Sequence, residues 1–160
     1  MSKIFLVNVG ANLKDQSLAR SPIFNDDRFI FVSFPDPDTK YRKPYPPKAR
    51  PFTRNVGIYN THADPDWDNL TYGDCPANGR AAALKQAKLR DILLFWALLW
   101  RNVGTSWKDF RKEKGWYLIG ALRIAEILSE GQRAKDAKSF NVKRAAKKGR
   151  RQGSCLVFAI

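Results

Sequence analysis

Several residue types that mark common protein classes are scarce in this chain. Cysteine occurs twice, at Cys75 and Cys155, which is too few and too widely spaced for a disulfide framework or a zinc site. The longest apolar run, Ile92–Trp100, is much shorter than the ~20 residues of a membrane-spanning helix. Asn8 and Gly10 interrupt the apolar run at the N-terminus, so no signal peptide is expected. We therefore expect a cytoplasmic protein with reduced thiols and no membrane association.

Sequence signatures of common catalytic sites are also missing. The chain contains no phosphate-binding glycine loop, no nucleophile elbow and no zinc-deaminase pattern, which combines His-x-Glu with Pro-Cys-x-x-Cys. Catalysis therefore has little direct support, and no cofactor is expected. Whether the protein is an enzyme stays open at this point.

Acidic residues are few compared with basic ones. Lysine and arginine total 29 against 15 aspartates and glutamates, which gives a formal net charge of +14. Such a charge either repels itself in the free protein or is neutralised by a polyanionic partner. Nucleic acid is the expected partner, ahead of a membrane surface, and a purely solubilising role is the alternative. The length of 160 residues and the hydrophobic content of 44% predict one globular domain over residues 1–160.

Two segments concentrate the positive charge. Residues 35–54 form a proline-rich connection, which is either a solvated crossover or an anion-binding arm. Residues 133–151 carry nine basic residues against one acid, Asp136. Contacts from such tracts to phosphates give affinity without sequence choice. The candidate phosphate-binding residues are Lys43, Arg50, Arg54, Lys143, Arg144, Lys147, Lys148, Arg150 and Arg151.

The pattern of apolar residues predicts a fold built mainly of strands. Short apolar or β-branched runs predict buried strands, and the helix formers of Ala77–Arg90 predict a helix. The polar stretch Asn12–Asp27, with Pro22 as a breaker, is a predicted loop. Strands are expected at Ile4–Val9, Phe29–Phe34, Val56–Tyr59, Asp91–Trp100, Gly115–Leu128 and Gly153–Ile160, with a turn or short helix at Trp107–Lys114.

Three of these predictions leave alternatives open. Periodicity alone also permits a helix at Asp91–Trp100. Gly120 is expected to mark a bulge or the close approach of another backbone. The apolar run that ends the sequence, Gly153–Ile160, indicates either a truncated chain or a strand in the centre of a sheet.

The segment Thr61–Asp74 is the most unusual part of the sequence. It contains the only histidine, four aspartates, a tryptophan and a tyrosine, with no helical or strand period. Like charges do not desolvate together unless something pairs with them, so this loop is a candidate site. No metal site is expected, but His62, Asp64 and Asp66 could alternatively bind magnesium or manganese. A third interpretation is a structural RNA-associated protein in which the loop is only a salt-bridged brace.

Short motifs along most of the chain point to a known family. They are LVNVGAN near the start, Pro22 and Phe24 ahead of FIFVSFP, then HADPDWDNLTYGD, LRDILLFWALLW, GWYLIGALRI and FNVKR. In this order and spacing they resemble the nucleotide modification associated domain 3 family, which is found in phages and bacteria near genes that make or handle modified bases. The chain ends earlier than this resemblance implies, and its proline-rich connection is unusually cationic.

The strand pair D-I-L-L-F-W and W-Y-L-I-G is also similar to a hairpin in PUA-like barrels, a group that includes the EVE, ASCH and YTH domains. Several of these domains hold a flipped or single-stranded base. The similarity implies an α+β fold, with a small bent mixed β-sheet or a partly closed PUA-like β-barrel and flanking helices.

A base-reading pocket needs flat aromatic walls and a few polar groups for the base edge. Trp67 and Trp107 lie in polar surroundings, whereas Trp96 and Trp116 are better explained by the core. Asp91 either ends a turn or accepts a hydrogen bond from a base amino group. The candidate base-binding residues are Trp67, Tyr72, Asp91, Trp96, Trp107, Asn8 and Asn12.

Two hypotheses follow. The first is a nucleic-acid-binding module that recognises or handles modified bases, in DNA more readily than in RNA. The alternative is a metal-dependent nucleotide- or DNA-modifying enzyme or nuclease centred on His62 and its neighbouring aspartates. The sequence does not predict the oligomeric state.

Overall fold

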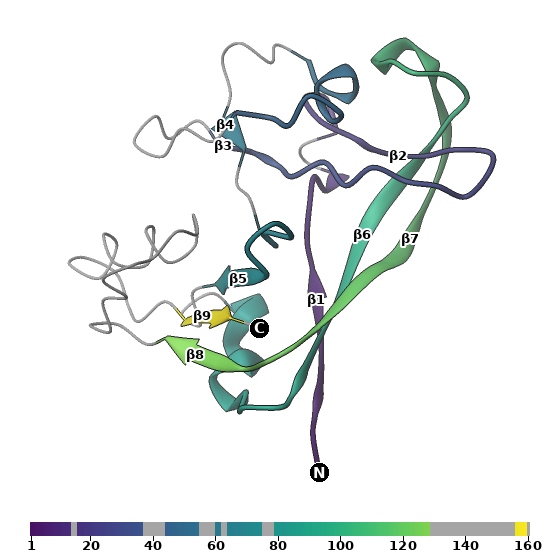
Figure 1. Cartoon of the computed structure of the whole chain (residues 1–160). Helices are drawn as coiled ribbons and strands as arrows, with labels where there is room; N and C mark the ends of the chain where they lie inside the picture. The colour runs from purple at the N-terminus through teal and green to yellow at the C-terminus, as the bar shows by residue number, and fades with distance from the viewer. Residues whose placement is uncertain are drawn as a thin grey trace. The chain divides into compact units, whose positions relative to one another are not determined.

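β-Strands make up most of the fold. The computed structural model describes residues 1–13, 16–36, 44–54, 60–61, 64–74, 79–128 and 156–159, and the helical segments named in this part of the chain are 3-10 helices (Figure 1). Internal packing divides the chain into two compact units. Unit 1 comprises Met1–Val7, Asp64–Leu94 and Gly120–Ile160, and unit 2 comprises Asn8–Ala63 and Phe95–Ile119.

The largest sheet is organised around strand β6 (Ile92–Asn102), which pairs with β1 (Ile4–Asn8), β2 (Ser21–Ile23) and β7 (Phe110–Arg123). β2 runs parallel to β6. β7 follows β6 after a connection that is too short for a parallel crossover, so the two long strands form an antiparallel hairpin (Figure 1).

The side chains of β6 explain why this segment is a strand. Leu93, Phe95, Ala97 and Leu99 are all almost completely buried, at every second position. This spacing is the period of a β-strand, in which alternate side chains point to the same face. The predicted strand is confirmed here, and the helical alternative was wrong. The predicted first strand is confirmed as β1.

Two smaller sheets complete the described strands. β5 (Thr71–Asp74), β9 (Leu156–Ala159) and β8 (Glu126–Leu128) form an antiparallel sheet with β9 in the middle, so the terminal apolar run is a central strand. β3 (Pro35–Asp36) pairs with β4 (Asn60–Thr61). The described sheets are open, so the expected closure toward a barrel is not found in them.

The helical elements with described bounds are η2 (Arg50–Phe52), η3 (Gly79–Gln86) and η4 (Trp107–Asp109), so the flanking helices of an α+β fold are not confirmed. η3 lies within the helix predicted at 77–90 but is a 3-10 helix. Ala81 and Leu84 are buried, and their spacing of three residues is the 3-10 period. No helix in the ranges given above is long and apolar enough to cross a membrane.

The strand predicted at Phe29–Phe34 was wrong. Its backbone is satisfied by other partners: Val32 N–H donates to Ser21 Oγ at 2.9 Å, and Ile30 N–H donates to Pro22 O at 3.1 Å. The strand forms instead at Ser21–Ile23, inside the predicted loop. Pro22 is tolerated there because β2 stands at the end of the order β1-β6-β2, and proline is compatible with an edge strand.

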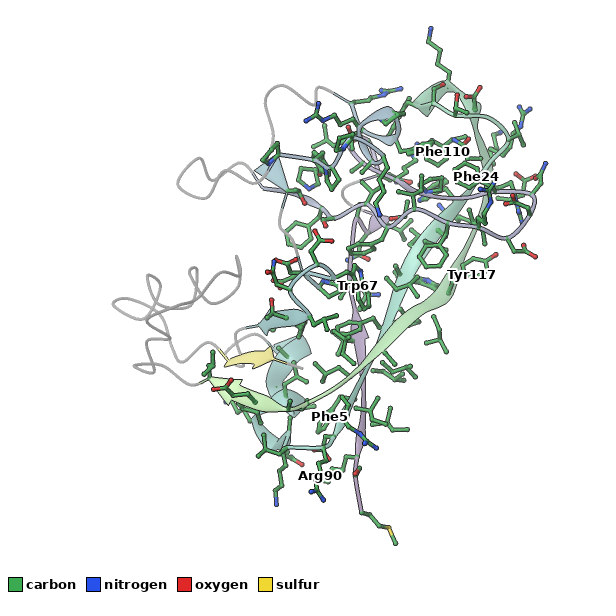
Figure 2. All side chains as sticks on the ribbon, in the orientation of Figure 1. Phe5, Phe24, Trp67, Arg90, Phe110 and Tyr117 are labelled. Carbon is green, nitrogen blue, oxygen red and sulfur yellow. The ribbon has the colours of Figure 1, made fainter. Side chains whose placement is uncertain are left out.

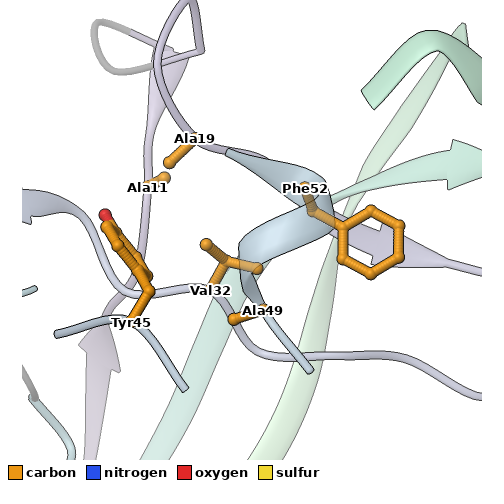
Figure 3. Close-up of a cluster of buried hydrophobic side chains, with 6 residues drawn as sticks. All are labelled: Ala11, Ala19, Val32, Tyr45, Ala49 and Phe52. Atoms are coloured by element: carbon orange, nitrogen blue, oxygen red, sulfur yellow. The ribbon is translucent and has the colours of Figure 1, made fainter. Parts of the chain in front are cut away.

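A buried cluster in unit 2 joins the proline-rich connection to the rest of that unit (Figure 3). Tyr45, Ala49 and Phe52 come from this connection, and each is at most 3% exposed. They pack with Ala11, Ala19 and Val32. The connection is therefore partly core, and η2 gives it local order. Residues 37–43 and 133–151, together with the strand predicted at 56–59, lie outside the described residues.

The remaining predictions concern the end of the hairpin. The short helix expected near Trp107 is confirmed as η4, but β7 already begins at Phe110. The strand predicted at 115–128 is present as the second part of β7 followed by β8.

Candidate functional site

The acidic loop folds into a tight turn in unit 1. Asp66 and Thr71 exchange both backbone hydrogen bonds, at 2.8 and 3.1 Å. Asp66 Oδ2 accepts from Asn69 Nδ2 at 3.0 Å, and Asp64 Oδ1 accepts from Gly73 N–H at 3.0 Å. Both aspartates are buried, and these bonds compensate their desolvation. The geometry supports a structural brace for these two carboxylates.

The two aromatic residues of this loop are held in different ways. Tyr72 is 3% exposed, and its hydroxyl donates to Asp74 Oδ2 at 2.8 Å. Trp67, which is labelled in Figure 2, is half-buried. Its ring lies over Gly120 of β7, where a Cβ atom would be 2.5 Å from Trp67 Cη2. The glycine therefore marks the approach of an indole ring, whereas the sequence had predicted a bulge or another backbone.

The described residues give no geometric support to the metal hypothesis centred on His62. Within the described ranges, no group of three or more His, Cys, Asp or Glu side chains lies close enough to hold a metal ion. His62 itself lies outside these ranges. A metal site at the acidic loop stays a hypothesis from sequence.

Asp91, the candidate at the start of the hairpin, binds backbone. Its Oδ1 accepts from Lys3 N–H at 2.8 Å and its Oδ2 accepts from Lys88 N–H at 2.9 Å. These bonds, that to Lys3 first, lower the pKa of Asp91. The carboxylate is 4% exposed and ties the N-terminal segment to the turn before β6.

The other sequence candidates near β1 and β6 lie in unit 2. Asn8 and Asn12 are half-buried on either side of Gly10, which has a φ of +79° and turns the chain at the end of β1. Trp96 contacts Trp116 with ring centroids 5.0 Å apart. The ring of Trp116 is 45% exposed, so the indole pair has one open member on β7.

A group of cations stacked on two tryptophans stands out in unit 2. The Arg20 guanidinium lies 4.4 Å from the Trp100 ring centroid and 4.7 Å from that of Trp107. Arg54 lies 4.9 Å from the Trp107 ring, and the Lys114 ammonium lies 4.2 Å from the Trp100 ring. We call these residues the cation–tryptophan cluster: Arg20, Arg54, Trp100, Trp107 and Lys114.

The backbone brings the members of this cluster together. Arg20 N–H donates to Phe52 O at 3.1 Å and Arg54 N–H donates to Leu18 O at 2.7 Å, so the two arginines sit on neighbouring extended segments. Arg20 directly precedes β2, whose parallel register places Pro22 opposite Trp100. Arg20 Nε is further fixed by donating to Gln16 O at 2.9 Å.

A helix cap holds Trp107 in place. Ser106 is the N-cap of η4, and its side chain accepts from Lys108 N–H. Asp109 Oδ2 accepts from the N–H groups of Thr105 and Ser106 at 3.0 and 2.9 Å. The side-chain hydrogen bond from Ser106 is the largest cause of the lowered pKa of Asp109. The turn after β6 is therefore a rigid support for the indole.

The cluster contains three cations and no acid. In the part of the chain that the structure describes, no carboxylate forms an ion pair with Arg20, Arg54 or Lys114. Burial, and secondarily the like charge of Arg54, lower the pKa of Arg20. A lowered pKa means that the cationic form is disfavoured, and an anion placed between the guanidinium groups would relieve this cost.

Only part of this cluster was predicted from the sequence. Arg54 and Trp107 were candidates. Arg20 was missed because it is an isolated cation in its segment, and Lys114 was missed because it lies outside the two segments that concentrate the positive charge. Arg50, another candidate, is exposed and donates from Nε to Tyr45 O at 3.0 Å. The candidates that lie outside the described residues are Lys43, Lys143, Arg144, Lys147, Lys148, Arg150 and Arg151.

The comparison with protein families decides the relationship of this chain. A sequence model of nucleotide modification associated domain 3 (Nmad3) matches residues 3–159. The chain belongs to the Nmad3 family. The resemblance seen in the sequence is thereby confirmed, and the name of the Nmad3 family associates it with nucleotide modification. No match was found among curated proteins or among solved structures, and nothing here supports the relation to PUA-like barrels.

Proposed function

We propose that this Nmad3 domain is a nucleic-acid-binding module that recognises or handles modified bases. The cation–tryptophan cluster holds the phosphates of a bound strand, and the basic segments around it add affinity. DNA is the proposed target. The domain reads or presents the base, and catalysis is not part of the proposal.

One observation supports this function above others. Arg20, Arg54 and Lys114 are positioned on tryptophan rings without an acidic partner among the described residues. Cation–π contacts orient the guanidinium groups, while their N–H donors remain suited to bidentate phosphate binding. The formal net charge of +14 favours the same kind of partner.

The membership in the Nmad3 family supports the second half of the proposal. A family associated with nucleotide modification has its substrate or ligand among nucleotides, and a cationic surface suits the polymer rather than a neutral base alone. Flat side chains beside phosphate contacts are the usual arrangement for single-stranded targets.

The test is a binding panel. Single-stranded and duplex DNA and RNA of one sequence, with unmodified or modified bases, are titrated with the protein at several salt concentrations. We expect the association constant to fall steeply with salt and to differ between base forms. An association constant that is independent of salt would overturn the proposal. A steep salt dependence with equal affinity for all base forms would reduce it to a general polyanion binder.

A further inference from the structure

A groove in unit 2 lies beside the cation–tryptophan cluster and belongs to none of the sites predicted from sequence. Its volume is about 640 Å³, within the range of roughly 300–1,000 Å³ that is typical of small-ligand sites. We call it the Phe24 groove. It is lined by Phe24, Asn25, Asp26, Arg28, Phe29, Ile30, Lys48, Phe52, Asn102, Val103, Gly104 and Thr105.

The residues that line the groove include aromatic rings as well as polar and charged side chains. The rings of Phe24 and Phe52 pack edge to face with their centroids 5.9 Å apart. Phe29 is 40% exposed, so its ring is accessible to a ligand. Lys48 is exposed and forms no ion pair with a described carboxylate. Arg28 is occupied by Asp26 at 2.6 Å. Among the described residues that line the groove, Lys48 is therefore a cation without an ion pair.

Ring contacts lead from the groove to the cluster. The ring centroids of Phe52 and Phe110 are 6.0 Å apart, and those of Phe110 and Trp107 are 5.6 Å apart. Phe24 and Phe110, which are labelled in Figure 2, both contact Phe52. The turn that Asp109 stabilises also connects the groove with the cluster. Thr105, which donates its N–H to Asp109, lines the groove, and the ring of Trp107 contacts the guanidinium of Arg20. The groove and the cation–tryptophan cluster are thus linked by a continuous series of ring contacts.

We infer that the Phe24 groove is the base pocket of the proposed function and takes a single nucleobase from an unpaired strand. Phe29 stacks on the base, Lys48 meets the adjoining phosphate, and Arg20 and Arg54 hold the next phosphates. A paired base in a duplex is stacked on both faces, so only a single-stranded or extruded base enters. The volume leaves room for a base with a bulky substituent.

This inference rests on the proposed function. It places the base in the Phe24 groove instead of beside the acidic loop. Tyr72 in that loop is buried, and Trp67 is packed on Gly120. A nucleobase is favoured over an apolar peptide as the occupant because cations flank the aromatic floor and the chain carries a large excess of positive charge.

The experiment uses the full chain and a short DNA strand that is abasic except for one central base. A second strand is abasic throughout. Removing the base is expected to weaken binding of the wild type roughly 5- to 150-fold, the range for stacking of one base on an aromatic ring. Phe29→Ala should bind both strands equally, and Lys48→Ala should weaken both.

Tyr117→Ala is the matched control, because Tyr117 is 39% exposed, lies in the same unit and does not line the groove. It should keep the full base dependence. Phe29→Leu retains apolar volume without a flat ring, so it loses base dependence even if Phe29→Ala fails to fold. Lys85→Ala controls for the removal of one exposed charge.

The outcomes separate the two proposals. If Phe29→Leu discriminates between the strands as well as the wild type does, the groove is not the base pocket. If sedimentation shows self-association that depends on Phe29, the occupant is a second copy and the inference is wrong. Either result can coexist with salt-dependent binding through Arg54, which would leave the proposed function standing. Absence of salt-dependent binding by the wild type itself would overturn both.

Discussion

The indole ring of Trp67 covers Gly120 in the C-terminal part of β7. Glycine leaves a gap on a strand, and an aromatic ring placed over it restores the packing. This contact joins the acidic loop to β7 within unit 1. It explains both residues without a ligand, and it gives the acidic loop a structural role that can be measured.

Gly120→Ala should lower the free energy of unfolding by about 1–3 kcal/mol, because the new methyl group overlaps the indole. Urea denaturation followed by tryptophan fluorescence measures the loss. In the double variant with Trp67→Leu, which removes the overlapping ring, the added cost of the alanine should largely disappear. Strictly additive effects in this mutant cycle would contradict direct packing of the two residues.

Arg54→Ala should reduce the slope of log association constant against log salt by about one, because one phosphate contact is lost. The expected weakening is the same for every DNA sequence, since phosphate contacts carry no sequence information. Arg123→Ala removes another exposed arginine, from unit 1, and should leave the slope unchanged. Equal slopes for both variants would argue against the cation–tryptophan cluster as the phosphate site.

Asp91→Asn should destabilise the protein at neutral pH and much less in acid. The pKa of Asp91 is lowered in the folded state, so its stabilising effect is fully present above the unfolded-state pKa of about 3.9 and is lost as the pH falls through the folded-state value. Urea midpoints of wild type and variant should therefore converge below about pH 4. Asp68→Asn, at an exposed position of the acidic loop, is the control. A difference that grows in acid would contradict the assignment.

Ser106→Ala should cost about 0.5–2 kcal/mol, because it removes the N-cap of η4. The same change should loosen Trp107, so the fluorescence of that indole shifts and DNA affinity falls with stability. Ser106→Thr retains the capping hydroxyl and should restore both properties. Loss of stability without any effect on DNA binding would show that Trp107 does not position Arg20 and Arg54 for the ligand.

Local patterns were enough for the segments with long apolar runs. The apolar runs of β6 and β9 can be read directly from the sequence, and both were predicted as strands. The strand prediction for residues 29–34 was wrong. Aromatic and β-branched residues favour strands, but the backbone of this segment is hydrogen-bonded to Ser21 and Pro22. The helix formers of 79–86 give only a 3-10 helix.

The candidate site was predictable only in part. Arg54 and Trp107 were identified because they lie in a basic segment and a polar turn. The contribution of Arg20 depends on the parallel pairing of β2 with β6, and no short window of sequence shows such pairing. The acidic loop was predicted to be a site because of its composition. Hydrogen bonds to backbone and packing on Gly120 explain several of its side chains without a ligand.

The family, the excess of positive charge and the main hairpin can thus be inferred from the order of residues alone, because motifs, charge and apolar runs are local properties of the chain. Which cations meet which aromatic rings depends on contacts between residues far apart, such as Arg20 with Trp100 and Phe52 with Phe110. These contacts, and the groove beside them, exist only once the strands have paired, since pairing fixes the distances and directions of side chains that the sequence keeps separate.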